Sequence, residues 1–236
     1  MKKIKVVAHN GCLNTPDDSL ESIQKAIDHQ ADVMEIDIRF NALHIPVLSH
    51  DELVEGVDYI TAQAALALIA TDDAMMVNLD MKEKHDLVGL KQLKVLIESF
   101  NLKERVYFTG IGELDAALIS EVFSDYKFAT NFDFGYDDSK TKEEQYGEMY
   151  TRLHNETYLA DLAKRVKASG SIGLNLYHEF ITPPVAKICQ KYGLKLFAWT
   201  VESEKRVEEL IDLGVDGITS RNFAMCKHIV FTHCRQ

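Results

Sequence analysis

The sequence predicts an α/β protein built as a single (β/α)₈ barrel. Short apolar segments alternate with helical patterns along the whole chain, and eight such pairs fit within its 236 residues, the usual size of this fold. Polar residues also recur at the ends of the expected strands, where barrel enzymes place their active sites. The main alternative is an open doubly wound sheet, which has the same alternation.

The elements follow one another without a low-complexity linker, so residues 1–236 are expected to form one domain. The expected strands are Ile4–Ala8, Val33–Ile38, Met75–Met81, Val106–Thr109, Lys127–Asn131, Ile172–Leu176, Lys195–Val201 and Asp216–Thr219. The expected helices are Ser19–His29, Ala62–Ala70, Leu87–Phe100, Leu114–Phe123, Thr157–Ala168, Pro184–Tyr192, Glu204–Leu213 and one near Phe223–Ile229. Residues 132–150 are polar and acidic, and we expect a surface loop with a partly helical end.

Local signals support several of these boundaries. Asp18 followed by Glu21 resembles a capping box at the start of the first helix. Thr61 is expected to cap the alanine-rich helix that follows it. Gly193 and Gly214 come directly after helical segments, where a left-handed residue is common.

Composition and charge exclude several classes of protein. The chain is 46% hydrophobic and 27% charged, as is ordinary for a soluble globular protein, and its net charge of −11 argues against nucleic-acid binding. No apolar run reaches about 18 residues, so stable membrane insertion is not expected. The N-terminus has the pattern of a strand and not of a signal peptide. Four cysteines without a CxxC pair indicate reduced thiols, and we expect a cytoplasmic protein.

The stretch Val33–Asp51 carries the strongest chemical signal. In a strand, Glu35 and Asp37 share one face, while Met34 and Ile36 point to the other. Two acids on a buried face require compensation, because unpaired buried charge is costly. A divalent metal ion or a cationic substrate would supply it.

An internal ion-pair network would supply it as well, with Lys82 or Arg39 as the partner of the two acids. Asn78, Asp80 and Lys82 alternate along the third strand and so share a face. Asp80 would therefore add a third hard oxygen ligand, a set that suits Mg²⁺ or Ca²⁺.

Other polar residues are expected at the same end of the barrel, the mouth formed by the C-terminal ends of the strands. His9 ends the first strand and His50 follows the second, and the two can act as general base and general acid. Lys82 offers a positive charge to a phosphate oxygen. Trp199, near the end of the seventh strand, offers an apolar wall to the non-reacting part of a substrate.

Together these residues resemble the glycerophosphodiester phosphodiesterase family of phosphatidylinositol-phospholipase-C-like barrels. The similar segments are Val7-Ala8-His9-Asn10-Gly11, Pro16-Asp17-Asp18-Ser19, Met34-Glu35-Ile36-Asp37 with His50-Asp51, Asn78-Leu79-Asp80-Met81-Lys82, Phe197-Ala198-Trp199-Thr200-Val201 and Leu213-Gly214-Val215-Asp216-Gly217-Ile218. Each motif is weak alone, but six in the right order and spacing are specific.

The resemblance implies a metal-dependent enzyme with a small phosphodiester as its substrate. It implies that His9 and His50 form the catalytic pair and that Glu35, Asp37 and Asp80 bind the metal. The implied reaction cleaves a glycerophosphodiester to glycerol phosphate and an alcohol, through a cyclic phosphate formed by the neighbouring glycerol hydroxyl.

The sequence departs from the family pattern in four places. Asn10 and Asp17 are expected to bind the substrate phosphate, as Lys82 and Trp199 are expected to contact the substrate, but Asn10 stands where the family has a phosphate-binding arginine, and Asp17 and Asp80 each stand where it has a glutamate. Residues 51–79 are too few for the small domain that the family inserts after the second strand. Two other functions therefore stay open: a phospholipase acting on lipid headgroups, and a barrel that binds a phosphoester without cleaving it.

Overall fold

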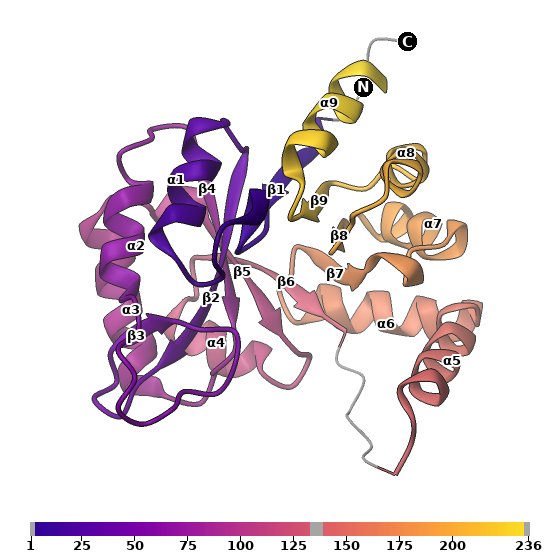
Figure 1. The fold of residues 1–236 in the computed structure, drawn as a ribbon. Helices are drawn as coiled ribbons and strands as arrows, with labels where there is room; N and C mark the ends of the chain where they lie inside the picture. The colour runs from indigo at the N-terminus through magenta and orange to yellow at the C-terminus, as the bar shows by residue number, and fades with distance from the viewer. Residues whose placement is uncertain (1–2, 133–138, 234–236) are drawn as a thin grey trace.

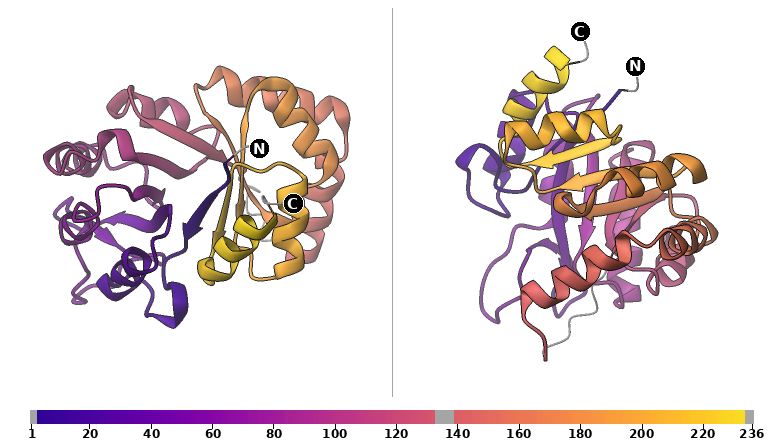
Figure 2. Two further views of the ribbon diagram at one scale, coloured as in Figure 1. Left: turned by 90° about the horizontal axis from the view of Figure 1, so that it is seen from above. Right: turned by 90° about the vertical axis from the view of Figure 1, so that its right-hand side faces the viewer.

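The computed structural model describes residues 3–132 and 139–233 as a closed barrel of eight parallel strands surrounded by helices (Figure 1, Figure 2). The barrel strands are β1 (Lys5–Ala8), β2 (Val33–Phe40), β4 (Met76–Met81), β5 (Val106–Ile111), β6 (Lys127–Asn131), β7 (Gly173–Tyr177), β8 (Lys195–Trp199) and β9 (Gly217–Ser220). Strand β1 pairs with both β2 and β9, which closes the sheet. The predicted barrel is confirmed, and the open sheet is excluded because β1 has no free edge.

Helices connect successive strands on the outside of the barrel. They are α1 (Leu20–Asp28), α2 (Ala62–Ile69), α3 (Leu87–Ser99), α4 (Ala116–Val122), α5 (Lys142–Leu153), α6 (Glu156–Ala168), α7 (Pro183–Tyr192), α8 (Glu204–Asp212) and α9 (Phe223–His233), with short 3₁₀ turns η1 (Cys12–Asn14), η2 (Lys103–Arg105) and η3 (His178–Phe180). The predicted elements end within about two residues of these bounds, except that α9 runs four residues further.

A ninth strand, β3 (Pro46–Leu48), pairs antiparallel with the last residues of β2. It was not expected, because three residues are too few to show a periodic pattern. Residues 49–61 lead directly from β3 to α2, so no inserted domain separates them, as predicted.

The segment 132–150 is more helical than expected. Residues 133–138 lie outside the described part of the chain, and α5 begins at Lys142, where Thr141 and Glu144 form a capping box. Met149 and Leu153 are its buried residues. With so few apolar positions, the helix has no apolar stripe that the sequence could reveal.

The predicted cap of α1 was wrong by one residue. Ser19, not Asp18, is the N-cap, and its hydroxyl accepts the Ser22 N–H at 3.1 Å. Thr61 caps α2 as predicted, and Gly193 takes the left-handed conformation after α7.

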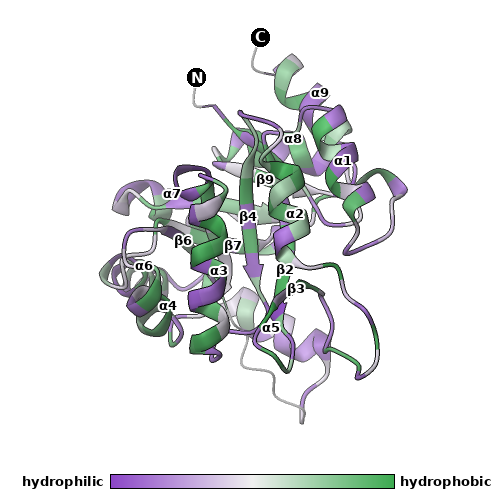
Figure 3. Ribbon diagram, turned by 90° about the vertical axis from the view of Figure 1, so that its left-hand side faces the viewer, coloured by the Kyte–Doolittle hydropathy of each residue, from purple (hydrophilic) through white to green (hydrophobic). Residues whose placement is uncertain are grey.

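The two faces of β2 differ as the alternation predicts. Met34, Ile36 and Ile38 belong to the main core between strands and helices, whereas Val33 packs with Tyr107 in a separate cluster. Hydrophilic residues interrupt the otherwise apolar β4 (Figure 3). The inward-facing positions near the C-terminal ends of the strands are therefore not used for apolar packing and can carry the polar residues of a functional site.

Candidate active site

A cavity of about 630 Å³ opens at the C-terminal ends of the barrel strands. All nine residues singled out from the sequence line it: His9, Asn10, Asp17, Glu35, Asp37, His50, Asp80, Lys82 and Trp199. They come from three strands, β2, β4 and β8, and from the loops that follow β1, β3 and β4. The barrel therefore gathers residues that are as much as 190 positions apart in the sequence.

Three carboxylates form the centre of this cavity. Glu35 and Asp37 lie on β2, and Asp80 lies beside Asp37 on the neighbouring strand β4. One oxygen of each carboxylate lies within 4.8 Å of the others. Among the described residues, no other group of three such ligands meets this distance. The three can hold a divalent cation, because hard oxygen donors are what Mg²⁺ and Ca²⁺ prefer.

The charge balance of the cluster supports a cation there. Burial, together with Asp37 and Asp80, raises the pKa of Glu35 well above its usual value. Lys82 Nζ lies 2.9 Å from Asp37 Oδ1 and 2.5 Å from Asp80 Oδ2. Burial alone would raise the pKa of Asp80, but Lys82 and the Thr109 hydroxyl lower it. One lysine facing three acids leaves negative charge that a divalent ion can balance.

His9 lies at the end of β1 beside the acids. Its Nδ1 is 2.6 Å from the Asn10 carbonyl oxygen and 3.9 Å from Glu35 Oε2. Because a carbonyl oxygen only accepts, Nδ1 donates its hydrogen to it, and the neutral ring keeps a lone pair on Nε2. This tautomer is the one that can take a proton from a substrate at Nε2.

His50 lies at the rim, on the loop after β3. Its Nδ1 is 2.8 Å from Asp51 Oδ1, so Nδ1 again donates and leaves Nε2 available. Its backbone N–H donates to Asp18 Oδ2 at 3.2 Å, and its carbonyl accepts from Arg39 Nη2 at 3.2 Å. Of the internal ion pairs weighed for Glu35 and Asp37, the structure has the one between Lys82 and Asp37, while Arg39 holds the His50 loop instead.

Asn10 is buried and faces acids. Its Nδ2 donates to Asp18 Oδ1 at 2.6 Å and to Asp37 Oδ2 at 3.0 Å, and its Oδ1 accepts the Asp18 N–H at 2.7 Å. Its backbone N–H donates to Glu35 Oε2 at 2.9 Å. The side chain of Asn10 therefore links Asp37, in the acid cluster, to Asp18, in the turn that precedes α1.

Trp199 forms part of an aromatic wall on the opposite half of the barrel. Its ring meets that of Tyr177 edge-on, with the centroids 5.7 Å apart. The buried indole N–H has no hydrogen-bond acceptor within residues 3–132 and 139–233. The wall is therefore apolar with one unused donor.

Residues 61–223 match the model of the glycerophosphoryl diester phosphodiesterase family, which is more than half of the chain. This chain belongs to that family. It is 22% identical over 250 residues to a glycerophosphodiester phosphodiesterase of Caldanaerobacter subterraneus subsp. tengcongensis, which covers 92% of this chain and 93% of that protein. The predicted membership is confirmed, and the chain is a phosphoric diester hydrolase.

Solved structures share its fold over nearly the whole chain. A glycerophosphodiester phosphodiesterase from Parabacteroides distasonis superposes with a TM-score of 0.77 at 17% identity, covering 99% of both chains. An Oleispira antarctica phosphodiesterase, solved in complex with the product sn-glycerol-3-phosphate, gives a TM-score of 0.75 at 15% identity and covers 96% of both chains.

The family match itself contains only part of the acidic mouth. Asp80 and Lys82 fall within residues 61–223, but His9, Glu35 and His50 lie before it. The barrel brings both groups into the same cavity.

Sequence reasoning missed several residues of the mouth. Asp18 was assigned to a helix cap, and Arg221, which pairs with Asp17, was not considered. Asn131 and Asn175 also line the cavity and bond to each other at 3.0 Å. A polar residue inside or at the end of a short apolar strand was the available signal for these two asparagines.

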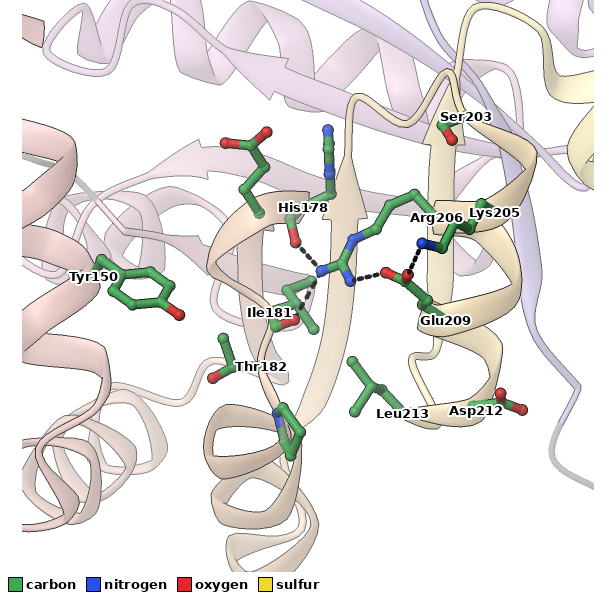
Figure 4. A pocket seen from close by; sticks show the side chains of 12 residues that line it. Tyr150, His178, Ile181, Thr182, Ser203, Lys205, Arg206, Glu209, Asp212 and Leu213 are labelled. Carbon is green, nitrogen blue, oxygen red and sulfur yellow. Dashed lines mark hydrogen bonds and ion pairs between the residues drawn. The ribbon is translucent and has the colours of Figure 1, made fainter. Parts of the chain in front are cut away.

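A second pocket, of about 750 Å³, lies between α8, η3 and the start of α7 (Figure 4). Arg206 lines this pocket. Its guanidinium donates to the carbonyl oxygens of His178 and Ile181 and pairs with Glu209 at 2.8 Å. These contacts tie η3 to α8. The pocket contains none of the nine predicted site residues.

Within residues 3–132 and 139–233, no helix combines the length and the hydropathy that crossing a bilayer requires.

Proposed function

We propose that this phosphodiesterase hydrolyses glycerophosphodiesters to glycerol phosphate and an alcohol, with a divalent metal ion, Mg²⁺ or Ca²⁺, held by Glu35, Asp37 and Asp80. The observation that carries the proposal is the gathering of three carboxylates and two histidines with free Nε2 atoms in one cavity. Family membership supports the substrate class. Its place of action would be the cytoplasm, in keeping with four cysteines that form no CxxC pair.

The bound metal would stabilise negative charge on the phosphoryl oxygens and lower the pKa of a coordinated hydroxyl. His9 would accept the proton of the attacking hydroxyl at Nε2, because Nδ1 already donates to the Asn10 carbonyl. His50, whose side chain is 63% exposed at the rim, would give a proton to the leaving alcohol. Attack by the neighbouring glycerol hydroxyl would give a cyclic phosphate, which water opens as the two histidines exchange roles.

Around this centre, Trp199 would contact the substrate and Lys82 would contact the metal ligands. Trp199 would pack against the glycerol or the alcohol group. Lys82 would balance charge at the metal ligands, since both of its close contacts are carboxylates. Asn10 would orient Asp37 through its hydrogen bond, so it would act on the phosphate through the metal ligand and not by direct contact.

The test is hydrolysis of glycerophosphocholine by the purified protein with Mg²⁺, with Ca²⁺ and with EDTA. We expect metal-dependent turnover, and kcat lowered by about 100-fold or more in His9→Ala and in His50→Ala. His228→Ala is the matched control, because His228 is exposed on α9 outside the cavity. Full activity of either mouth variant would contradict the assignment.

A lysophospholipid is the second candidate substrate. Leu43, Val54 and Val57 are 72%, 63% and 51% exposed, and they lie in the loops that flank β3 at the same end of the barrel. Apolar side chains there can contact an acyl chain. Faster turnover of lysophosphatidylcholine than of glycerophosphocholine would favour this substrate.

A further inference from the structure

Arg221 places a guanidinium at the rim of the mouth, directly after β9. Its Nη1 lies 2.6 Å from Asp17 Oδ1 and its Nη2 lies 3.4 Å from Asp17 Oδ2. Its backbone is fixed on both sides, since its N–H donates to Glu202 Oε1 at 2.9 Å and its carbonyl accepts the Leu13 N–H at 2.9 Å. The side chain is nevertheless 45% exposed, so it is open to a solute.

Arg221 differs from Lys82, the other basic residue at the cavity, in its exposure and in its partner. Of the described residues that line the cavity, only Lys82 and Arg221 are lysine or arginine. Lys82 is 21% exposed and contacts two predicted metal ligands. Arg221 forms its ion pair at the rim with Asp17, which is not one of the three predicted metal ligands. It is therefore the cation that an entering phosphodiester can reach.

The pair lies against the backbone that follows His9. Gly11 has φ +73°, and a Cβ added to it would come within 1.8 Å of Asp17 Oδ1 and 2.6 Å of Arg221 Nη1. The glycine therefore allows the ion pair to approach the His9–Gly11 turn. A phosphoryl group bound beside His9 would lie next to this guanidinium.

We propose that Arg221 binds the phosphoryl group of the substrate and that Asp17 occupies its guanidinium until the anion displaces the carboxylate. The proposal rests on the proposed function for the nature of the substrate. A planar guanidinium can donate two parallel hydrogen bonds to phosphate oxygens, as it does to a carboxylate. Arg221 would therefore provide a phosphate contact that Asn10 does not make, because the Asn10 side chain donates its hydrogen bonds to Asp18 and Asp37.

The test is calorimetric titration of the Mg²⁺-loaded protein with sn-glycerol 3-phosphate. We expect Arg221→Ala to weaken binding by about 10- to 100-fold, and Arg221→Lys, which keeps the charge but not the paired geometry, to weaken it less. Asp17→Asn should strengthen binding, because it removes the competing carboxylate. KM for glycerophosphocholine should change in the same directions.

Arg165→Ala is the matched control, because Arg165 is 41% exposed and pairs with Glu113 outside the mouth. It should bind sn-glycerol 3-phosphate like the wild type. A purely structural ion pair predicts that Arg221→Ala and Asp17→Asn weaken binding equally, and that result would overturn the proposal, as would wild-type binding by Arg221→Ala or no binding by the wild type. Binding through Arg221 without hydrolysis of any diester would contradict the proposed function alone.

Discussion

Asn10 Nδ2 donates a hydrogen bond to Asp37 Oδ2 at 3.0 Å, so Asn10 orients a predicted metal ligand. The same nitrogen also donates to Asp18 Oδ1 at 2.6 Å. A residue that hydrogen-bonds to a metal ligand fixes the direction of that ligand's lone pairs, and its removal commonly lowers metal affinity. The side chain of Asn10 is therefore placed to support the predicted metal site.

Asn10→Ala should weaken Mg²⁺ binding by about 10-fold or more, because Asp37 loses the donor that orients it. The dissociation constant can be measured by calorimetry and by the Mg²⁺ dependence of hydrolysis. Asn155→Ala is a useful control, since Asn155 caps α6 and does not line the cavity, and the change should cost about 1 kcal/mol of stability without changing Mg²⁺ affinity. Equal Mg²⁺ affinity in both variants would contradict the role given to Asn10.

Lys82→Met should make the metal-free protein less stable and more dependent on metal. Lys82 is the counter-charge of Asp37 and Asp80, and removing one partner of a largely buried pair costs about 3 kcal/mol. Added Mg²⁺ should then stabilise the variant more than the wild type, because the carboxylates have lost their competing cation. Urea unfolding with EDTA and with Mg²⁺ measures both effects. Lys103→Met, which removes an exposed pair with Asp125, should show neither.

The metal-free protein should lose stability as the pH rises. The pKa of Glu35 is raised in the folded state by burial and by Asp37 and Asp80, so the folded state holds its proton at a pH where the unfolded chain has released it. Stability from this group is therefore greatest below its unfolded pKa and falls as the pH rises through the folded pKa.

Glu35→Gln should remove this pH dependence. In EDTA the variant should be more stable than the wild type at about pH 8, and Mg²⁺ should stabilise it less, because a ligand is gone. Urea unfolding between about pH 5 and about pH 8 tests both statements. Glu121→Gln, an exposed change on α4, serves as the control and should keep the wild-type slope. A wild type whose stability rises with pH in EDTA would contradict the argument.

Most of the fold could be predicted because its signals are local. Apolar strands and helical patterns set the positions of the barrel elements, and Thr61 and Gly193 mark helix ends by their own chemistry. Two elements escaped prediction for physical reasons. Strand β3 is three residues long and depends on pairing with β2, and α5 is polar on nearly every face, so neither carries a periodic signal.

The candidate site was predictable wherever the strand alternation decides the direction of a side chain. Glu35, Asp37 and Asp80 share the mouth for that reason. Asp18 and Arg221 lie in turns, where direction depends on contacts with residues distant in sequence. Asp18 also has φ +51°, a left-handed conformation that a capping pattern does not reveal.

Asp18→Ala should lower kcat by about 10- to 100-fold, because its carboxylate accepts the backbone N–H of His50 at 3.2 Å and so positions the loop that carries this histidine. Asp18→Asn keeps an oxygen acceptor for that N–H and should recover part of the activity, which a loss of charge alone would not allow. Asp28→Ala, which removes an exposed acid on α1 that pairs with Gln24, is the control for kcat. Steady-state hydrolysis of glycerophosphocholine ranks the three variants, and an Asp18→Asn enzyme no more active than Asp18→Ala would show that positioning of His50 is not what Asp18 contributes.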